Sequence, residues 1–152
     1  MLREEGSKLT VMDFGTLETQ KGPTDAARLL DVFDQCEGLI VHAKPDAVAI
    51  EHLFFGRNVN TMLSVGRASG VLILAAARAG IEVVEYSPMQ VKMAVVGYGN
   101  ADKKQVQYMV QRILGLPEVP KPDDVADALA LAICHAHTYK LAEYKPSRVG
   151  KR

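Results

Sequence analysis

The chain has 152 residues, of which 48% are hydrophobic and 24% charged, and this composition is typical of a soluble globular protein with one sizeable core. Its 18 basic and 18 acidic residues balance, so the composition excludes a global attraction to nucleic acid, and any DNA contact requires a local basic patch. The longest apolar run is too short to span a bilayer and the charged N-terminus lacks a signal-peptide core, so we expect a cytoplasmic protein with no membrane partner.

Hydrophobic periodicity and turn residues predict alternating strands and helices. In chain order these are a strand over 9–18 that pairs with residues before Gly6, a helix over 26–43 with Thr24 as N-cap, a strand over 47–55, a helix over 58–79 ended by Gly80, a strand over 81–86, a helix over 88–96, a helix over 102–114 ended by Gly115, and a helix from Asp123 or Asp124 to about residue 140. Such alternation indicates a layered α/β fold. We expect one domain over 1–143 and a basic, mobile tail over 144–152.

Glu51 is the first chemically unusual residue, because it lies inside the apolar run Ala-Val-Ala-Ile-Glu-His-Leu-Phe-Phe. A lone carboxylate is costly to bury. Glu51 therefore either lies at the strand's C-terminal end, facing solvent or a basic partner, or faces a cation.

Asp124 and Asp127 are the second feature. Their spacing places both carboxylates on one face of the last helix. Acidic residues are also common in a first helical turn, where they favour the helix dipole, and we assign Asp123 only that role. If Glu51 lies near the aspartate pair, mutual repulsion among the three carboxylates would be relieved by a hard divalent cation such as Mg²⁺.

The two cysteines, Cys36 and Cys134, form no C-x-x-C pair and are expected to be reduced core residues. His135 and His137 are two residues apart on a helix, so their side chains point to different sides and are interpreted as structural.

Six short motifs, in colinear order over nearly the whole chain, resemble the RuvC family of Holliday-junction resolvases. They are Ala-Ile-Glu51-His-Leu-Phe-Phe, Gly66-Arg-Ala-Ser-Gly-Val, Val91-Lys92, Val95-Val-Gly-Tyr-Gly, Lys103-Lys104-Gln-Val-Gln, and Asp124-Val-Ala-Asp127-Ala-Leu-Ala. The resemblance implies an RNase H-like fold, with a mixed five-stranded sheet flanked by helices. It also implies a Mg²⁺-dependent endonuclease, with Mn²⁺ as a possible substitute, that resolves four-way junctions by paired symmetric nicks in recombination and repair.

The resemblance also implies individual roles. Glu51, Asp124 and Asp127 would be catalytic metal ligands, and Lys92 a catalytic and DNA-contacting lysine. Further DNA contacts would come from Phe54, Arg67, Lys103 and Lys104, although Phe54 is equally compatible with core packing. The family implies a homodimer, for which the small-residue helix over 58–79 is the candidate interface, and a partnership with the RuvA–RuvB branch-migration complex.

One family element is missing from the given sequence. The first, central strand of the sheet, which carries a further catalytic aspartate, has no counterpart before Glu51, and Asp13 lacks the Pro-Gly that should follow it. We hypothesise that Met1 is an internal start and that the natural chain continues upstream. If the chain is instead as given, we expect it to cut DNA little or not at all, because one carboxylate of the metal site is missing.

Two alternatives remain open at this point. The chain could be a non-catalytic, junction-binding homologue that lacks the first catalytic aspartate. It could also be an RNase H-like nuclease for another branched or RNA-containing substrate, although the lysine and Gly-Tyr-Gly motifs argue against this.

Overall fold

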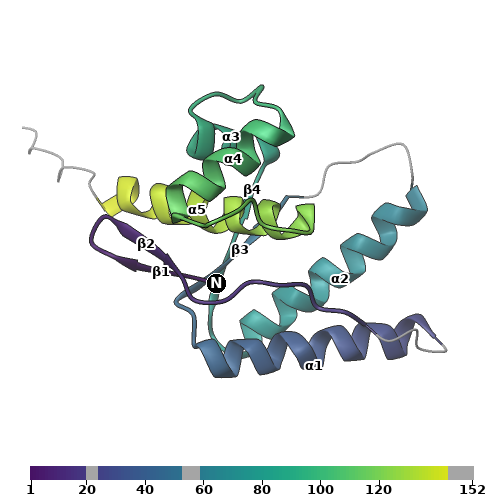
Figure 1. Ribbon diagram of the computed structural model, residues 1–152. Coiled ribbons are helices and arrows are strands. Elements are labelled where there is room, and N and C mark those ends of the chain that lie inside the picture. Colours follow the sequence, from purple (N-terminus) through teal and green to yellow (C-terminus); the bar gives the residue numbers. More distant parts are fainter. Residues whose placement is uncertain (20–23, 53–58, 144–152) are drawn as a thin grey trace, which may run out of the picture. The chain divides into compact units, whose positions relative to one another are not determined.

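The computed structural model describes residues 1–19, 24–52 and 59–143. Its elements are β1 (Leu2–Glu5), β2 (Lys8–Val11), α1 (Asp25–Ala43), β3 (Ala47–Glu51), α2 (Val59–Arg78), β4 (Glu82–Tyr86), α3 (Pro88–Val96), α4 (Lys103–Leu114) and α5 (Asp123–Glu143) (Figure 1). They form two compact units. We call residues 15–87 the central unit, and residues 1–14 with 88–152 the terminal unit.

The central unit is a β–α–β arrangement with one additional helix. Strands β3 and β4 are parallel, in a register that runs from Ala47 opposite Glu82 to Glu51 opposite Tyr86. Parallel neighbours need a crossover, which α2 provides. Helix α1 packs on α2 through a core that includes Cys36, Ile40, Ala75 and Ala76. The small side chains of the two alanines let the helices approach closely. Ala75 therefore packs in this core and is not exposed for the dimer interface that was predicted on the same helix.

Local signals fix the ends of α1 as predicted. The Thr24 side chain accepts a hydrogen bond from the Ala27 N–H at 3.2 Å, which makes it the N-cap. At the other end Lys44 adopts a left-handed conformation, with φ 46°, and donates its N–H to the Ile40 carbonyl. The chain then enters β3 after Pro45, a residue that disfavours further helix before it.

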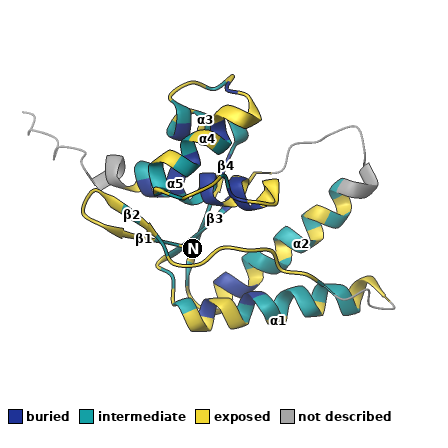
Figure 2. Ribbon diagram, in the orientation of Figure 1, coloured by how far each residue is buried: buried dark blue, intermediate teal, exposed yellow. Residues whose placement is uncertain are grey.

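The terminal unit combines a hairpin with three helices. Strands β1 and β2 are antiparallel and are joined by a turn at Gly6, whose φ of 61° suits a residue without a Cβ atom. Helix α5 packs against α3 and α4 and supplies most of the core. Its buried residues cover a broad face, shown dark blue in Figure 2, and are Val125, Ala126, Leu129, Ala130, Ile133, Cys134 and Ala136.

Two predicted strands are shorter than expected. The strand predicted over 9–18 starts one residue earlier and ends at Val11, which pairs with Leu2, the first residue of β1. The strand predicted over 47–55 ends at Glu51, opposite Tyr86, the last residue of β4. The predicted helices agree with the observed ones to within two or three residues.

The described strands lie in two separate two-stranded sheets, β1–β2 and β3–β4. Both cysteines are free and buried, as predicted. In the described ranges no helix is long and apolar enough to cross a membrane.

Candidate functional site

The start of α5 presents to solvent Asp124, in its first turn, and Asp127, about one turn later. Both side chains are exposed, whereas Val125 and Ala126 between them are 2% and 0% exposed. The buried pair anchors this helix turn in the core, and the three-residue spacing then directs both carboxylates outward on one face. The structure therefore agrees with the predicted arrangement of the aspartate pair.

A polar cluster joins the start of α5 to α4. The Lys103 ammonium lies 3.1 Å from the Asp123 carboxylate and 3.7 Å from that of Asp127. The Gln107 side chain donates to the other Asp123 oxygen at 2.9 Å. We call Lys103, Gln107, Asp123 and Asp127 the α4–α5 polar cluster.

The cluster shifts the pKa values of Lys103 and Asp123. The hydrogen bond to Asp123 raises the pKa of Lys103, and the charge of Asp127 adds to this effect. The hydrogen bonds from Lys103 and then Gln107 lower the pKa of Asp123. Both shifts favour the charged forms of Lys103 and Asp123, so the two groups stay an ion pair near neutral pH.

Glu51 occupies the last position of β3, and its side chain is exposed. It therefore avoids the burial that its apolar sequence context suggested. The adjacent His52 places its Nδ1 atom 2.7 Å from the Glu85 carboxylate, which β4 contributes. Glu51 and Glu85 are thus exposed carboxylates at this end of the β3–β4 pair, on opposite faces because they belong to successive register pairs.

The other predicted site residues lie on separate elements. Lys92 is half-buried on α3, and Lys104 is exposed on α4. Phe54, the predicted stacking residue, lies outside the described residues, as does the predicted basic tail.

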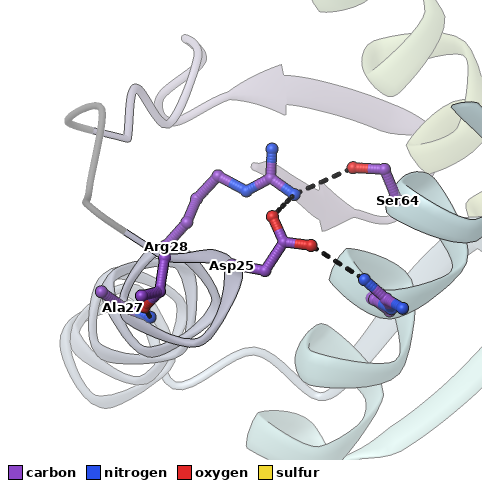
Figure 3. A network of polar contacts seen from close by, with 6 residues as sticks. Asp25, Ala27, Arg28 and Ser64 are labelled. Carbon is purple, nitrogen blue, oxygen red and sulfur yellow. Dashed lines mark hydrogen bonds and ion pairs between the residues drawn. The ribbon is translucent and has the colours of Figure 1, made fainter.

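Arg67 on α2 belongs to a network between the two helices of the central unit, of which Asp25, Arg28 and Ser64 are labelled in Figure 3. Its guanidinium lies 2.9 Å from the Asp25 carboxylate. The same carboxylate lies 3.4 Å from Arg28, which also donates to the Ser64 hydroxyl at 3.0 Å. Two guanidinium groups share one carboxylate, so the network links α1 to α2 and keeps an excess positive charge.

The sequence analysis did not predict that Asp123 and Gln107 belong to a polar cluster. A first-turn aspartate is already explained by the helix dipole, so Asp123 suggested no further role, and Gln107 is its partner. The available signal was a pair of matching spacings. Lys103 and Gln107 are four residues apart on one helix, and Asp123 and Asp127 are four apart on the next. Helix α4 therefore presents two donor side chains on one face, and α5 presents two acceptor carboxylates on one face.

Carboxylate oxygens are the ligands that Mg²⁺ and Mn²⁺ prefer, so the chemistry of Glu51, Asp124 and Asp127 fits a divalent ion. Among the described residues, no group of three or more His, Cys, Asp or Glu side chains is placed to hold a metal ion. Glu51 belongs to the central unit and the aspartate pair to the terminal unit. The three-carboxylate site therefore stays a prediction.

Comparisons with known proteins identify the relatives of this chain. The family model described as "Crossover junction endodeoxyribonuclease RuvC" matches residues 1–135. The protein of that name from Syntrophomonas wolfei is 47% identical over 99% of this chain and 88% of the relative. Its namesake from Heliobacterium modesticaldum is 53% identical over 91% of this chain and 85% of the relative.

Solved structures give the same answer. Thermus thermophilus RuvC in complex with Holliday junction substrate matches with a TM-score of 0.86 and 34% identity, over 93% of this chain and 86% of that one. A second structure of Thermus thermophilus RuvC matches with a TM-score of 0.84 and 35% identity, over the same shares of the two chains. The chain thus has an RNase H-like α/β fold. It belongs to the RuvC family of crossover junction endodeoxyribonucleases.

Proposed function

We propose that this chain is a structure-specific endonuclease that binds four-way junction DNA and nicks two opposed strands, with Mg²⁺ as the cofactor and Mn²⁺ able to replace it. The observation that carries the proposal is the exposed Asp124 and Asp127 pair on α5, in a chain whose relatives are crossover junction endodeoxyribonucleases. The pair offers hard oxygen ligands on an element that is firmly anchored in the core.

The ligands of the divalent ion would be Glu51, Asp124 and Asp127. When bound, the ion supplies a water of lowered pKa and neutralises charge that develops on the phosphodiester. The roles of the chain's own residues follow from their chemistry. The three carboxylates bind and orient, while the Lys92 and Lys103 ammonium groups contribute positive charge for a backbone phosphate.

The remaining proposed DNA contacts surround this chemistry. Lys104 on α4 would contact the phosphate backbone from solvent, and Arg67 would do so with the excess positive charge of its Asp25 network. Phe54 would stack on an unpaired base. Because the chain is neutral overall, these local charges would carry the affinity, which should fall steeply with salt concentration.

We further propose a homodimer, because paired nicks in opposed strands require two active sites related by a two-fold axis. Leu63, Gly70 and Leu74 lie at seven- and four-residue spacings on one exposed face of α2, which makes this face the proposed interface. The proposal includes a cytoplasmic location and cooperation with the RuvA–RuvB complex, both of which rest on the family alone.

The direct test compares a synthetic four-way junction with a linear duplex of the same sequence, in Mg²⁺ and in EDTA. It uses the 152-residue chain. Paired nicks in the junction alone, in Mg²⁺ alone, would support the proposal. Junction binding without nicking would contradict it and favour the non-catalytic alternative.

A further inference from the structure

In the α4–α5 polar cluster, each oxygen of the Asp123 carboxylate has its own partner. Oδ1 accepts from the Gln107 amide at 2.9 Å, and Oδ2 lies 3.1 Å from the Lys103 ammonium. Gln107 follows Lys103 by one helical turn of α4, so the two partners approach Asp123 from the same helix. A carboxylate held at both oxygens has a defined orientation, and this orientation fixes where the ammonium lies.

The same ammonium is close to one of the proposed metal ligands. Lys103 is 3.7 Å from the Asp127 carboxylate, compared with 3.1 Å for Asp123. The shorter contact makes Asp123 the main anchor of the lysine. If a divalent ion engages Asp127, Lys103 can give up the longer contact and still be held at the same place by Asp123.

We propose that Asp123, oriented by Gln107, is a positioning residue that keeps the Lys103 ammonium beside Asp127, where it can meet a backbone phosphate. This inference rests on the proposed nuclease function and adds a residue to it. The contacts of the Asp123 carboxylate are with Lys103 and Gln107, so in this proposal it acts through Lys103. An exposed ion pair contributes little to folding, and removal of Asp123 should therefore leave the fold intact.

The test compares Asp123→Ala and Asp123→Asn with Glu118→Ala, which removes the same charge from an exposed position outside the cluster. Residues that orient a group at a metal site typically contribute about 10-fold to activity. We expect both Asp123 variants to lower kcat on the junction by about this factor in saturating Mg²⁺, with little change in KM. Glu118→Ala should match the wild type in both constants.

The effect must also act through the lysine. In a Lys103→Ala background, Asp123→Ala should cause no further loss of kcat, because the group that it positions is already gone. An equal loss in both backgrounds would overturn the proposal. Asp123→Glu, which keeps a carboxylate, should recover part of the rate.

A second measurement does not depend on activity. In the metal-free full chain, the ¹H–¹⁵N signal of the Lys103 ammonium, identified by its loss in Lys103→Ala, should be visible in the wild type and broadened by Asp123→Ala. An unchanged signal would overturn the proposal. If the wild type fails to nick junctions, the proposed function fails on its own, and the ammonium signal still decides whether Asp123 positions Lys103.

Discussion

The exposed aspartates of α5 illustrate how a residue is assigned a role by its neighbours. A first-turn acidic residue needs no special explanation, because it favours the helix dipole. Asp124 and Asp127 differ from this ordinary case because buried Val125 and Ala126 lock the helix turn between them. A rigid turn fixes the directions in which both side chains leave the backbone, which is what a metal ligand requires and a solvated charge does not.

Substitution of Asp127 tests this role. Asp127→Asn keeps the side-chain shape but removes the charge that would bind the ion. We expect the nicking rate to fall by about 100-fold or more, since ion-assisted charge stabilisation is worth several kcal/mol. Junction affinity, measured by fluorescence anisotropy, should not fall, because one negative charge near the DNA is lost.

Glu118→Gln is the matched control, with the same charge change at an exposed site. A nicking rate for Asp127→Asn equal to that of this control would remove Asp127 from the proposed site.

The two cysteines give a prediction about pH. Cys36 and Cys134 are 5% and 1% exposed, and burial raises the pKa of both thiols. A pKa that is higher in the folded state contributes stability below the unfolded thiol pKa of about 8.5, and this contribution is lost as the pH rises further. The urea midpoint should therefore decline above that pH.

The double variant Cys36→Ala, Cys134→Ala isolates this effect from other groups that titrate at alkaline pH, and its midpoint should decline less. The native thiols should also react slowly with a disulfide reagent at pH 8 and rapidly in urea. Fast reaction of both in the native protein would contradict their burial.

At the scale of the element, local signals determined what could be predicted from the sequence. Thr24, Gly80 and Gly115 mark helix ends because capping and left-handed turns depend on nearby residues. The ends of β2 and β3 could not be predicted equally well, because each strand stops where its partner stops. Tyr86, which pairs with Glu51, is 35 residues away along the chain.

The same distinction applies to the candidate site. The i,i+3 aspartate pair follows from helix geometry and was predictable. The contact of Lys103 with Asp123 depends on how α4 packs on α5, and that of Arg67 with Asp25 depends on how α1 packs on α2. The four-residue spacings indicate which side chains share a helix face, but no local pattern shows that two such faces meet.

The start of α4 provides an element-scale prediction. Asp102 accepts a hydrogen bond from the Gln105 N–H at 2.9 Å, and the Gln105 side chain accepts one from the Asp102 N–H at 2.8 Å, which completes a capping box. Asp102→Ala should cost about 1 kcal/mol of stability. This corresponds to a Tm decrease of about 2–4 °C for a chain of this size.

Calorimetry measures this change. Asp102→Asn retains a good capping side chain and should have a Tm close to that of the wild type. An equal loss for the two variants would indicate that the charge of Asp102, rather than its capping geometry, stabilises α4.

At the scale of the whole molecule, the proposed ligands are divided between two compact units, with Glu51 in one and the aspartate pair in the other. A homodimer would add a second level of organisation, because each copy would act on one of the two strands that are cut.

The proposed dimer interface on α2 can be tested by introducing a single charged side chain. Leu74 is 54% exposed, and we expect Leu74→Glu to convert a dimer into a monomer, because it would bury an unpaired carboxylate in the interface. Light scattering coupled to gel filtration should give about twice the chain mass for the wild type and about one chain mass for the variant. Met89→Glu, at a 65% exposed position on α3, is the control and should remain dimeric. A monomeric wild type, or a dimeric Leu74→Glu, would exclude this interface.

The most direct test of the metal site is cleavage of the protein backbone by a bound iron ion. Fe²⁺ takes oxygen ligands and, with ascorbate and peroxide, generates radicals that cut the chain beside its binding site. We predict two sets of cuts, one near Glu51 and one near Asp124 and Asp127, both suppressed by excess Mg²⁺ and both weakened by Glu51→Gln. Cuts at only one of these segments, or cuts that Mg²⁺ does not suppress, would contradict a shared site.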